Sequence, residues 1–318
     1  IYEEKDEGFT CGLDISSDEK YFLIKTSDLT TSEIYFFDVN KTNPKPKLFR
    51  KRQKEIEYSI DSWKGYFYIH TNLDAEDFKI CTCKHDNIEK WQDYIPATNG
   101  VLIGGFNLLN KWMIRSEVRD ALAKLYVRNL DTNIEEELII TDEKVISPGA
   151  SLMQKDRNTN KIYIAYQSPK TPGKAYIYNV LTKEKKLVKE EIVPSGHNPN
   201  DYVVQRLSCN SHDGKKIPLT ITRHKNTQLD GSANLLLYAY GSYGNSMGPA
   251  FSSNILSLIN RNIIVVIAHV RGGMERGYNW WKDGKMLNKK NTFKDYLSSA
   301  KFLIEKKYTS KGKIIGMG

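Results

Sequence analysis

The sequence predicts a multi-domain β plus α/β fold, and three observations support it. Strand-like runs recur at a nearly constant spacing over residues 21–188. A segment rich in Pro, Gly and Asn follows at residues 193–200, as is typical of a linker. After it, continuous apolar runs alternate with helical patterns. We therefore expect one domain over residues 1–195 and a second over residues 196–318.

The repeat in the first part is marked by four strand-like runs that begin near Tyr21, Phe67, Trp112 and Ile162, at steps of 46, 45 and 50 residues. Each is followed 11 to 14 residues later by a second run, and three of the four then end in a short strand at 47–49, 138–140 or 186–188. Antiparallel strands at such regular spacing predict about four blades of a β-propeller. A single β-sandwich is the alternative.

The second part carries the pattern of a parallel sheet. After a hairpin around Asp213-Gly214, apolar runs without alternation occur at 235–240, 263–268 and 313–316, as expected of strands buried on both faces. Helical spacing lies between these runs, and Thr292 with Asp295 resembles the cap that begins a helix. The two expected apolar helix faces are Phe251/Ile255/Leu258/Ile259 and Phe293/Leu297/Ala300/Ile304.

Composition and charge exclude several classes of protein. Hydrophobic residues make up 40% of the 318 residues, too many for a disordered chain. Lys and Arg exceed Asp and Glu by 47 to 38, but the basic residues are scattered and accompany no RNA- or DNA-binding motif, so we expect no nucleic-acid partner. No apolar run reaches the about 18 residues of a membrane helix and no signal-peptide pattern is recognisable, so we expect a cytoplasmic protein without a membrane partner.

The four cysteines do not predict a metal or redox site. Cys81 and Cys83 are separated by one residue, whereas common zinc and redox motifs have two, and their alternation fits a strand. Reduced thiols are typical of the cytoplasm. We expect neither a metal nor a cofactor.

Candidate functional residues follow two of the apolar runs. Tyr240 lies in the segment 238–244, where a tyrosine hydroxyl at a strand end can donate to a developing oxyanion, although a core aromatic beside a turn would look the same. In the segment 269–277, Arg271 and Glu275 flank Gly272 and Gly273, and an Arg271–Glu275 ion pair is the simplest reading. The glycine spacing does not fit a dinucleotide site.

Two histidines are weaker candidates for a general base. His269 follows a strand and His197 lies in the linker, and for both a loop-anchoring role is the simpler interpretation.

The last residues resemble the beginning of a nucleophile elbow. Residues 314–317 read as a strand, and Gly318 fits the first glycine of the Gly-x-Ser-x-Gly turn of α/β-hydrolases. The serine would fall two positions beyond Gly318. We therefore expect a fragment of a longer protein.

Together these segments resemble the prolyl oligopeptidase family of serine peptidases, and within it the oligopeptidase B branch. The segments 238–244, 269–273 and 281–296 carry the resemblance, and 281–296 is the most specific. The resemblance implies the back part of a seven-bladed propeller followed by the first part of an α/β-hydrolase domain.

The resemblance also implies an activity and a site. It implies proteolysis of short peptides after Lys or Arg, with Tyr240 in the oxyanion hole, Arg271, Gly272, Gly273 and Glu275 as structural residues near it, and the Ser, Asp and His of the triad beyond Gly318. The 318-residue chain alone is then expected to be inactive.

Two features leave room for other readings. The branch carries two acidic residues shortly after Tyr-Gly-Ser-Tyr-Gly, where this chain has Gly248 and Ala250, so a dibasic preference is not expected. The alternative to an enzyme fragment is a non-catalytic degenerate chain, or a binding partner that complements a separate chain carrying the triad.

Overall fold

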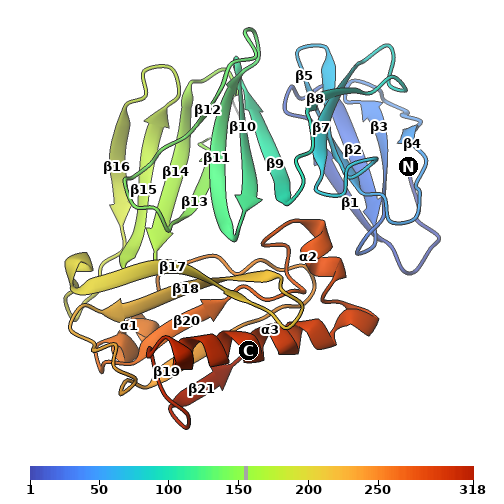
Figure 1. Cartoon of the computed structure of the whole chain (residues 1–318). Helices are drawn as coiled ribbons and strands as arrows, with labels where there is room; N and C mark the ends of the chain where they lie inside the picture. The colour runs from blue at the N-terminus through green and yellow to red at the C-terminus, as the bar shows by residue number, and fades with distance from the viewer. Residues whose placement is uncertain (154–156) are drawn as a thin grey trace.

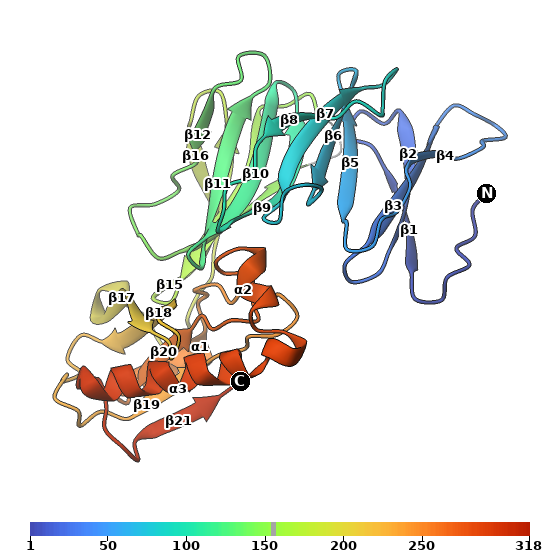
Figure 2. The same ribbon diagram turned by 45° about the vertical axis from the view of Figure 1, so that its right-hand side comes forward.

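The computed structural model describes residues 1–153 and 157–318, and these residues form two domains (Figure 1). Within them, the first domain contains four sheets of four antiparallel strands, each built from strands that are consecutive in the chain. In two views the sheets stand side by side above the second domain, as blades do (Figure 2). The expected propeller architecture is therefore confirmed, and the sandwich alternative is wrong.

The four blades share one pattern of strands. They consist of β1 (Thr10–Ile15), β2 (Tyr21–Ser27), β3 (Ser32–Asp38) and β4 (Lys47–Arg50); β5 (Tyr58–Trp63), β6 (Tyr66–Thr71), β7 (Lys79–Lys84) and β8 (Gln92–Ile95); β9 (Val101–Leu109), β10 (Trp112–Arg119), β11 (Leu122–Asn129) and β12 (Glu135–Glu137); and β13 (Ser147–Leu152), β14 (Lys161–Ser168), β15 (Thr171–Asn179) and β16 (Lys185–Glu190). The residues used as repeat markers lie in the second strand of each blade. Cys81 and Cys83 are buried in β7, as the alternation predicts.

The last strand of the third blade is not where the sequence places it. The structure has β12 at Glu135–Glu137, whereas the apolar residues suggested 138–140. Leu138 and Ile140 are buried against Ile162 and Ile164 of the next blade instead. Their side chains fill the space between two blades after the strand has ended, which is why they are apolar.

The second domain is built on a five-stranded sheet in the order β17-β18-β20-β19-β21. Strands β20, β19 and β21 are parallel, while β17 and β18 form the antiparallel edge. The strands are β17 (Tyr202–Asn210), β18 (Lys216–His224), β19 (Leu235–Tyr238), β20 (Ile264–Ala268) and β21 (Ile314–Met317), and the helices are α1 (Ser253–Ile259), α2 (Tyr278–Lys282) and α3 (Lys290–Glu305), with single turns at Pro199–Asp201 and Met286–Asn288. This is the start of the expected hydrolase sheet.

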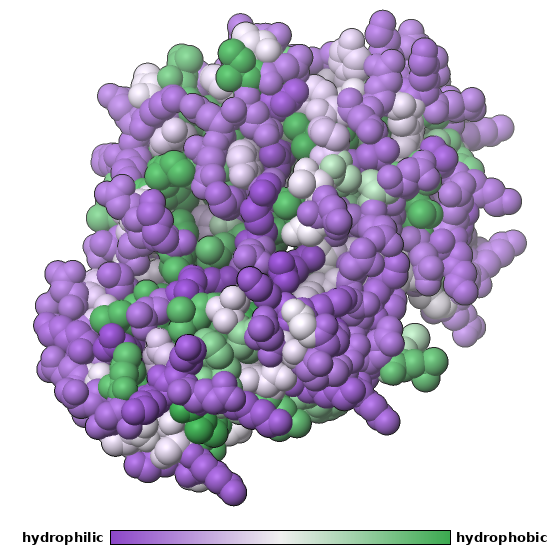
Figure 3. Space-filling view, viewed as in Figure 1, coloured by the Kyte–Doolittle hydropathy of each residue, from purple (hydrophilic) through white to green (hydrophobic). Residues whose placement is uncertain are grey.

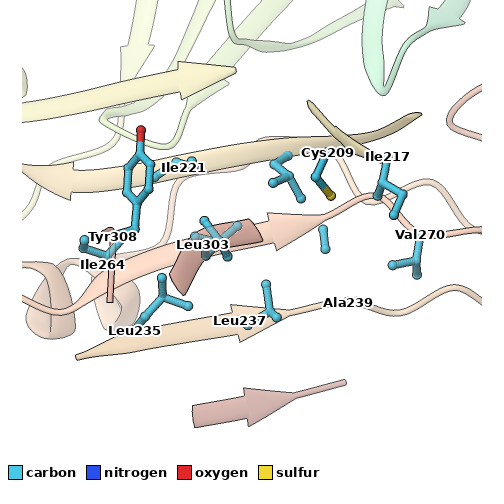
Figure 4. Close-up of a cluster of buried hydrophobic side chains, with 13 residues drawn as sticks. Cys209, Ile217, Ile221, Leu235, Leu237, Ala239, Ile264, Val270, Leu303 and Tyr308 are labelled. Carbon is cyan, nitrogen blue, oxygen red and sulfur yellow. The ribbon is translucent and has the colours of Figure 1, made fainter. Parts of the chain in front are cut away.

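The core of this domain lies between the sheet and α3. Leu303 of α3 packs against Leu235, Leu237 and Ile264 of the parallel strands (Figure 4). The opposite face of the sheet packs against α1 through Leu256. Burial on both faces explains why β19 and β20 are continuously apolar. The expectation of burial on both faces is wrong for β21, which is largely exposed at the edge of the sheet.

The residues of the first expected helix face pack together in one cluster, although Phe251 lies outside the helix, and the second expected face is wrong. Helix α1 begins after Ser252, whose hydroxyl accepts the Ile255 N–H, so Phe251 precedes the helix although it is buried. In α3, Phe293 and Leu297 are 62% and 58% exposed, and the buried positions are Thr292, Asp295, Ser299 and Leu303. Because most of the buried positions of α3 are polar, the spacing of its apolar residues does not indicate which face is buried.

The hairpin turn is also longer than Asp-Gly alone suggests. Strands β17 and β18 are joined by residues 211–215, and only Gly214 in this turn has a positive φ, of 81°. Asp213 instead turns its carboxylate toward the second domain's buried arginine, Arg271. The turn is therefore shaped by a tertiary contact.

Helix α2 joins the two domains. Tyr278 and Trp281 are buried with Trp63 and Ile80 of the second blade. Asp77, between β6 and β7, accepts the Tyr278 N–H at 2.6 Å through one carboxylate oxygen and the Gly100 N–H at 2.6 Å through the other. The propeller thus supplies the capping carboxylate for a helix of the other domain.

Hydrophilic residues cover most of the visible face of both domains, and hydrophobic residues appear between them in small groups (Figure 3). No helix of the described residues is both long and apolar enough to cross a membrane.

Candidate active site

The parallel strands β19 and β21 end side by side and bring two candidate residues to one edge of the sheet. Tyr238 lies opposite Met317, and the Ala239 N–H donates to the Met317 carbonyl at 3.1 Å. A Cβ added to Gly318 would lie 2.5 Å from the Ala239 carbonyl oxygen. Tyr240 and Gly318 therefore follow the carboxyl ends of neighbouring strands, where active sites of open α/β sheets form.

The Tyr240 side chain is available to a ligand at this edge. It is 38% exposed, and its hydroxyl has no hydrogen-bond partner among the residues described in the structure. A phenol in this state can donate to an oxygen that enters the site. The assignment of Tyr240 to an oxyanion hole stays a prediction.

The turn after Tyr240 is packed too tightly for side chains. Gly241 and Gly244 have φ angles of 62° and 70°, which favour glycine. A Cβ on Gly272 would lie 1.9 Å from the Gly241 carbonyl oxygen, so the two loops touch through their backbones. The Gly244 N–H donates to the Gly272 carbonyl at 3.0 Å. Gly272 and Gly273 thus shape the loop that carries Tyr240.

Three polar residues at the start of α3 hold these loops in place. Lys289 donates through Nζ to the Gly241 carbonyl, Thr292 Oγ1 donates to the Arg271 carbonyl at 2.7 Å, and Asp295 accepts the Arg271 N–H at 3.0 Å. They are spaced three residues apart and so share one side of the helix. The capping arrangement expected for Thr292 and Asp295 is wrong: α3 begins at Lys290 without a side-chain cap.

Arg271 is the centre of a buried ion-pair network, but not with the expected partner. Its Nε and Nη2 lie 2.8 and 2.6 Å from the Asp295 carboxylate, and its Nη1 lies 2.6 Å from Asp213. The arginine and Asp295 side chains are 1% and 0% exposed. The expected Arg271–Glu275 ion pair is therefore wrong, because the guanidinium pairs with Asp295 and Asp213, which come from other segments of the chain.

Glu275 is buried for a different purpose. Its Oε1 accepts the Met247 N–H at 3.1 Å, while Oε2 has no partner among the described residues. Burial raises the pKa of Glu275 to about 7. Its backbone carbonyl accepts the Ala121 N–H of the propeller at 2.7 Å. Glu275 thus links the loop after Tyr240 with the first domain.

The two histidines have the contacts of anchors. His269 is 1% exposed and its Nε2 lies 2.8 Å from Thr220 Oγ1. Burial, with a smaller effect of Arg206, lowers the pKa of His269 to about 3, so its imidazole is neutral. His197 Nε2 lies 2.6 Å from the Lys170 carbonyl, to which it donates, and this contact fixes the linker to the turn between β14 and β15.

Sequence reasoning missed Lys289, Asp213 and Asp295 as residues that organise the site. All three lie in segments that the sequence had singled out for other reasons, namely the Asp-Gly turn and the segment 281–296. The signal that could have found Asp295 is the helical spacing of the polar residues Thr292, Asp295 and Ser299, which are buried in α3. Among the described residues, no group of three or more His, Cys, Asp or Glu is placed to hold a metal ion.

Comparison with known proteins identifies the class. The family model described as the prolyl oligopeptidase N-terminal beta-propeller domain matches residues 1–191, and the model described as the prolyl oligopeptidase family matches residues 249–318. The chain belongs to the prolyl oligopeptidase family.

Individual relatives place it near the oligopeptidase B branch. The chain is 34% identical to dipeptidyl aminopeptidase BI of Pseudoxanthomonas mexicana and 30% identical to protease 2 of Moraxella lacunata, covering 100% of this chain but 44% and 46% of those proteins. Oligopeptidase B of Trypanosoma brucei, solved in a closed form with covalently bound antipain, superposes with a TM-score of 0.92 at 29% identity over 99% of this chain and 46% of that one. The chain thus spans less than half the length of these relatives.

Proposed function

We propose that this chain forms part of the propeller and the oxyanion side of the active site in a serine-type oligopeptidase, with the nucleophile outside its 318 residues. The observation that carries the proposal is the pairing of β19 with β21, after which Tyr240 and Gly318 follow the ends of neighbouring strands. A serine two positions further on would attack a peptide carbonyl. The Tyr240 hydroxyl and a backbone N–H beside the serine would then stabilise the oxyanion.

The proposed substrates are short peptides cleaved after Lys or Arg. The likeness to oligopeptidase B and protease 2 supports this class. Gly248 and Ala250 carry no charge, and Ala250 lines an apolar cavity of about 300 Å³ together with Tyr238 and Met317. None of the described residues that line this cavity has a carboxylate that could bind a second basic residue. We expect one basic residue to be sufficient.

Two measurements test the proposal. The purified 318-residue chain should neither cleave an arginyl chromogenic peptide nor react with a serine-directed phosphonate, whether the peptide's amino terminus is blocked or free. The coding sequence after Gly318 should encode one further residue and then Ser-x-Gly-Gly, in frame or beyond a stop codon or frameshift. Phosphonate-sensitive turnover by the chain itself, or a continuation without that serine, would overturn the proposal.

A second function is favoured by the edge of the sheet. Strand β21 is the last strand in the sheet order, and Ile315 and Met317 are 54% and 55% exposed. An unpaired edge of this kind accepts a further strand. The chain would then act as the complementing partner of a polypeptide that carries the triad. Co-purification of such a polypeptide with the tagged chain would support this function, and monomeric elution from its native host extract would contradict it.

A further inference from the structure

We propose that Lys289 is a positioning residue for Tyr240, an inference that rests on the proposed function of Tyr240 as an oxyanion donor. The side chain of Lys289 is half-buried, and its Nζ donates to the Gly241 carbonyl and to Ser242 Oγ, the latter at 2.7 Å. These two acceptors belong to the residues directly after Tyr240. Hydrogen bonds from an ionised donor are about twice as strong as those between neutral groups.

The position of Lys289 is unfavourable for helix α3 itself. Lys289 stands at the cap position of a sixteen-residue helix, and its side chain makes no capping hydrogen bond. A cation at a helix N-terminus is opposed by the helix dipole. Among the described residues no carboxylate pairs with Lys289, and burial lowers its pKa. Among the described residues, the side-chain hydrogen bonds of Lys289 that offset these costs are those with Gly241 and Ser242.

The orientation of Tyr240 depends on its backbone. Because its hydroxyl has no partner among the described residues, no side-chain contact of that group fixes the ring. The residue before it is held by the Ala239–Met317 hydrogen bond, and the residue after it is held by Lys289. Gly241 has a φ of 62° and leaves no room for movement toward Thr292. Tyr240 therefore lies between the Ala239–Met317 hydrogen bond and Gly241, which is held by Lys289 together with the close backbone contact of Gly272. Of these contacts, that of Lys289 is made by a side chain and can be removed by substitution.

The neighbouring Lys290 provides a matched control. It is exposed, it begins α3, and it loses the same charge when changed to methionine. Lys289→Met and Lys290→Met therefore remove the same charge, but of the two only Lys289→Met removes the hydrogen bonds to residues 241 and 242. Lys289→Arg keeps the charge and the donors and serves as the conservative variant.

The experiment uses the 318-residue chain and needs no peptidase activity. 3-Fluorotyrosine at position 240 gives a single ¹⁹F resonance, and hydrogen exchange reports the Gly244 and Asn245 amides, which donate to the Gly272 and Ser242 carbonyls. In Lys289→Met we expect exchange of these amides to be faster by about ten- to hundredfold, as for loss of a hydrogen bond to a charged group. We also expect the ¹⁹F resonance to shift or broaden. Lys290→Met should match the unchanged chain, and Lys289→Arg should restore the single resonance.

Two results would overturn the inference. Equal behaviour of Lys289→Met and Lys290→Met would show that the contacts of Lys289 hold nothing in place. Faster exchange with an unmoved ¹⁹F resonance would show that Lys289 holds the loop without positioning Tyr240. Neither result bears on whether a serine follows Gly318, so failure of this inference and failure of the proposed function are distinguishable.

Discussion

Replacing Asp295 with asparagine should destabilise the second domain more than any surface change of the same kind. Asp295 is fully buried and accepts four hydrogen bonds, at 3.0, 2.8 and 2.6 Å from Arg271 and at 2.5 Å from Ser211. Asparagine keeps the shape but removes the charge and turns one acceptor into a donor. The guanidinium is then left buried with Asp213, whose side chain is 33% exposed.

The expected loss follows from the burial of the pair. Breaking a buried ion pair by removing one partner costs about 3–5 kcal/mol, because the other charge stays away from water. Asp283→Asn is the control, since Asp283 pairs with Lys215 at the surface with side chains 34% and 46% exposed, and such pairs contribute about 0–1 kcal/mol. Replacing both charges, as in Arg271→Met with Asp295→Leu, should cost less than Asp295→Asn alone.

Urea unfolding followed by tryptophan emission and far-UV circular dichroism measures these differences. The free energy of unfolding is taken from the midpoint and the slope, and an unchanged slope shows that the folded state is as compact as before. A loss for Asp295→Asn no larger than that for Asp283→Asn would refute the reasoning. So would a double variant that is less stable than Asp295→Asn.

Three further predictions concern other parts of the structure. Asp77→Ala removes the acceptor of the Tyr278 and Gly100 N–H groups and should lower the free energy of unfolding in urea by about 1–3 kcal/mol. Glu76→Ala, at the exposed neighbour, should change that free energy little. Equal losses of unfolding free energy in the two variants would contradict the interdomain cap. Gly272→Ala should prevent folding of the second domain, because the new Cβ would lie 1.9 Å from the Gly241 carbonyl oxygen. Gly214→Ala is the control: a Cβ there has nothing within 4 Å, so this change should cost about 1 kcal/mol of backbone strain. A native circular dichroism spectrum and thermal melt for Gly272→Ala would contradict the close contact. The pKa of Glu275 is raised from 4.5 to about 7 on folding, so the folded state retains a proton that the unfolded state loses, and stability should fall as pH rises from about 4.5 to 7 by about 3 kcal/mol. Glu275→Gln should remove that fall, and parallel pH profiles for the two chains would show that Glu275 does not titrate in this range.

Much of the propeller could be predicted because each blade has two central strands with aromatic and branched apolar residues at a fixed spacing. The first strands were harder to recognise. Strand β1 is exposed along its whole length and β13 contains Pro148 and Gly149, so neither shows a clean alternation. A strand that faces solvent needs no apolar residues, so its sequence shows no alternation of apolar and polar residues. The places of β1 and β13 in their sheets come from pairing with β2 and β14.

The site was predictable in its strands and not in its polar contacts. Tyr240 and Gly318 follow apolar runs, and runs of this kind pair in parallel, so their common edge could be expected. Arg271 was expected to bind Glu275, four residues away, but it binds Asp295 and Asp213 from distant segments. Local spacing suggests partners only within one helix or turn. A buried charge takes whichever opposite charge the tertiary fold brings to it.

The central claim is that this chain holds the oxyanion side of a serine peptidase site whose nucleophile lies two positions beyond Gly318. Mass spectrometry after treatment with a serine-directed fluorophosphonate tests it most directly, applied to the 318-residue chain and to the polypeptide extended through the coding sequence that follows Gly318, with any frameshift or stop codon repaired. We expect no adduct on the chain itself and one adduct on the extended polypeptide, at the second residue after Gly318. An adduct on any serine of the 318 residues, or none on that second residue, would contradict the claim.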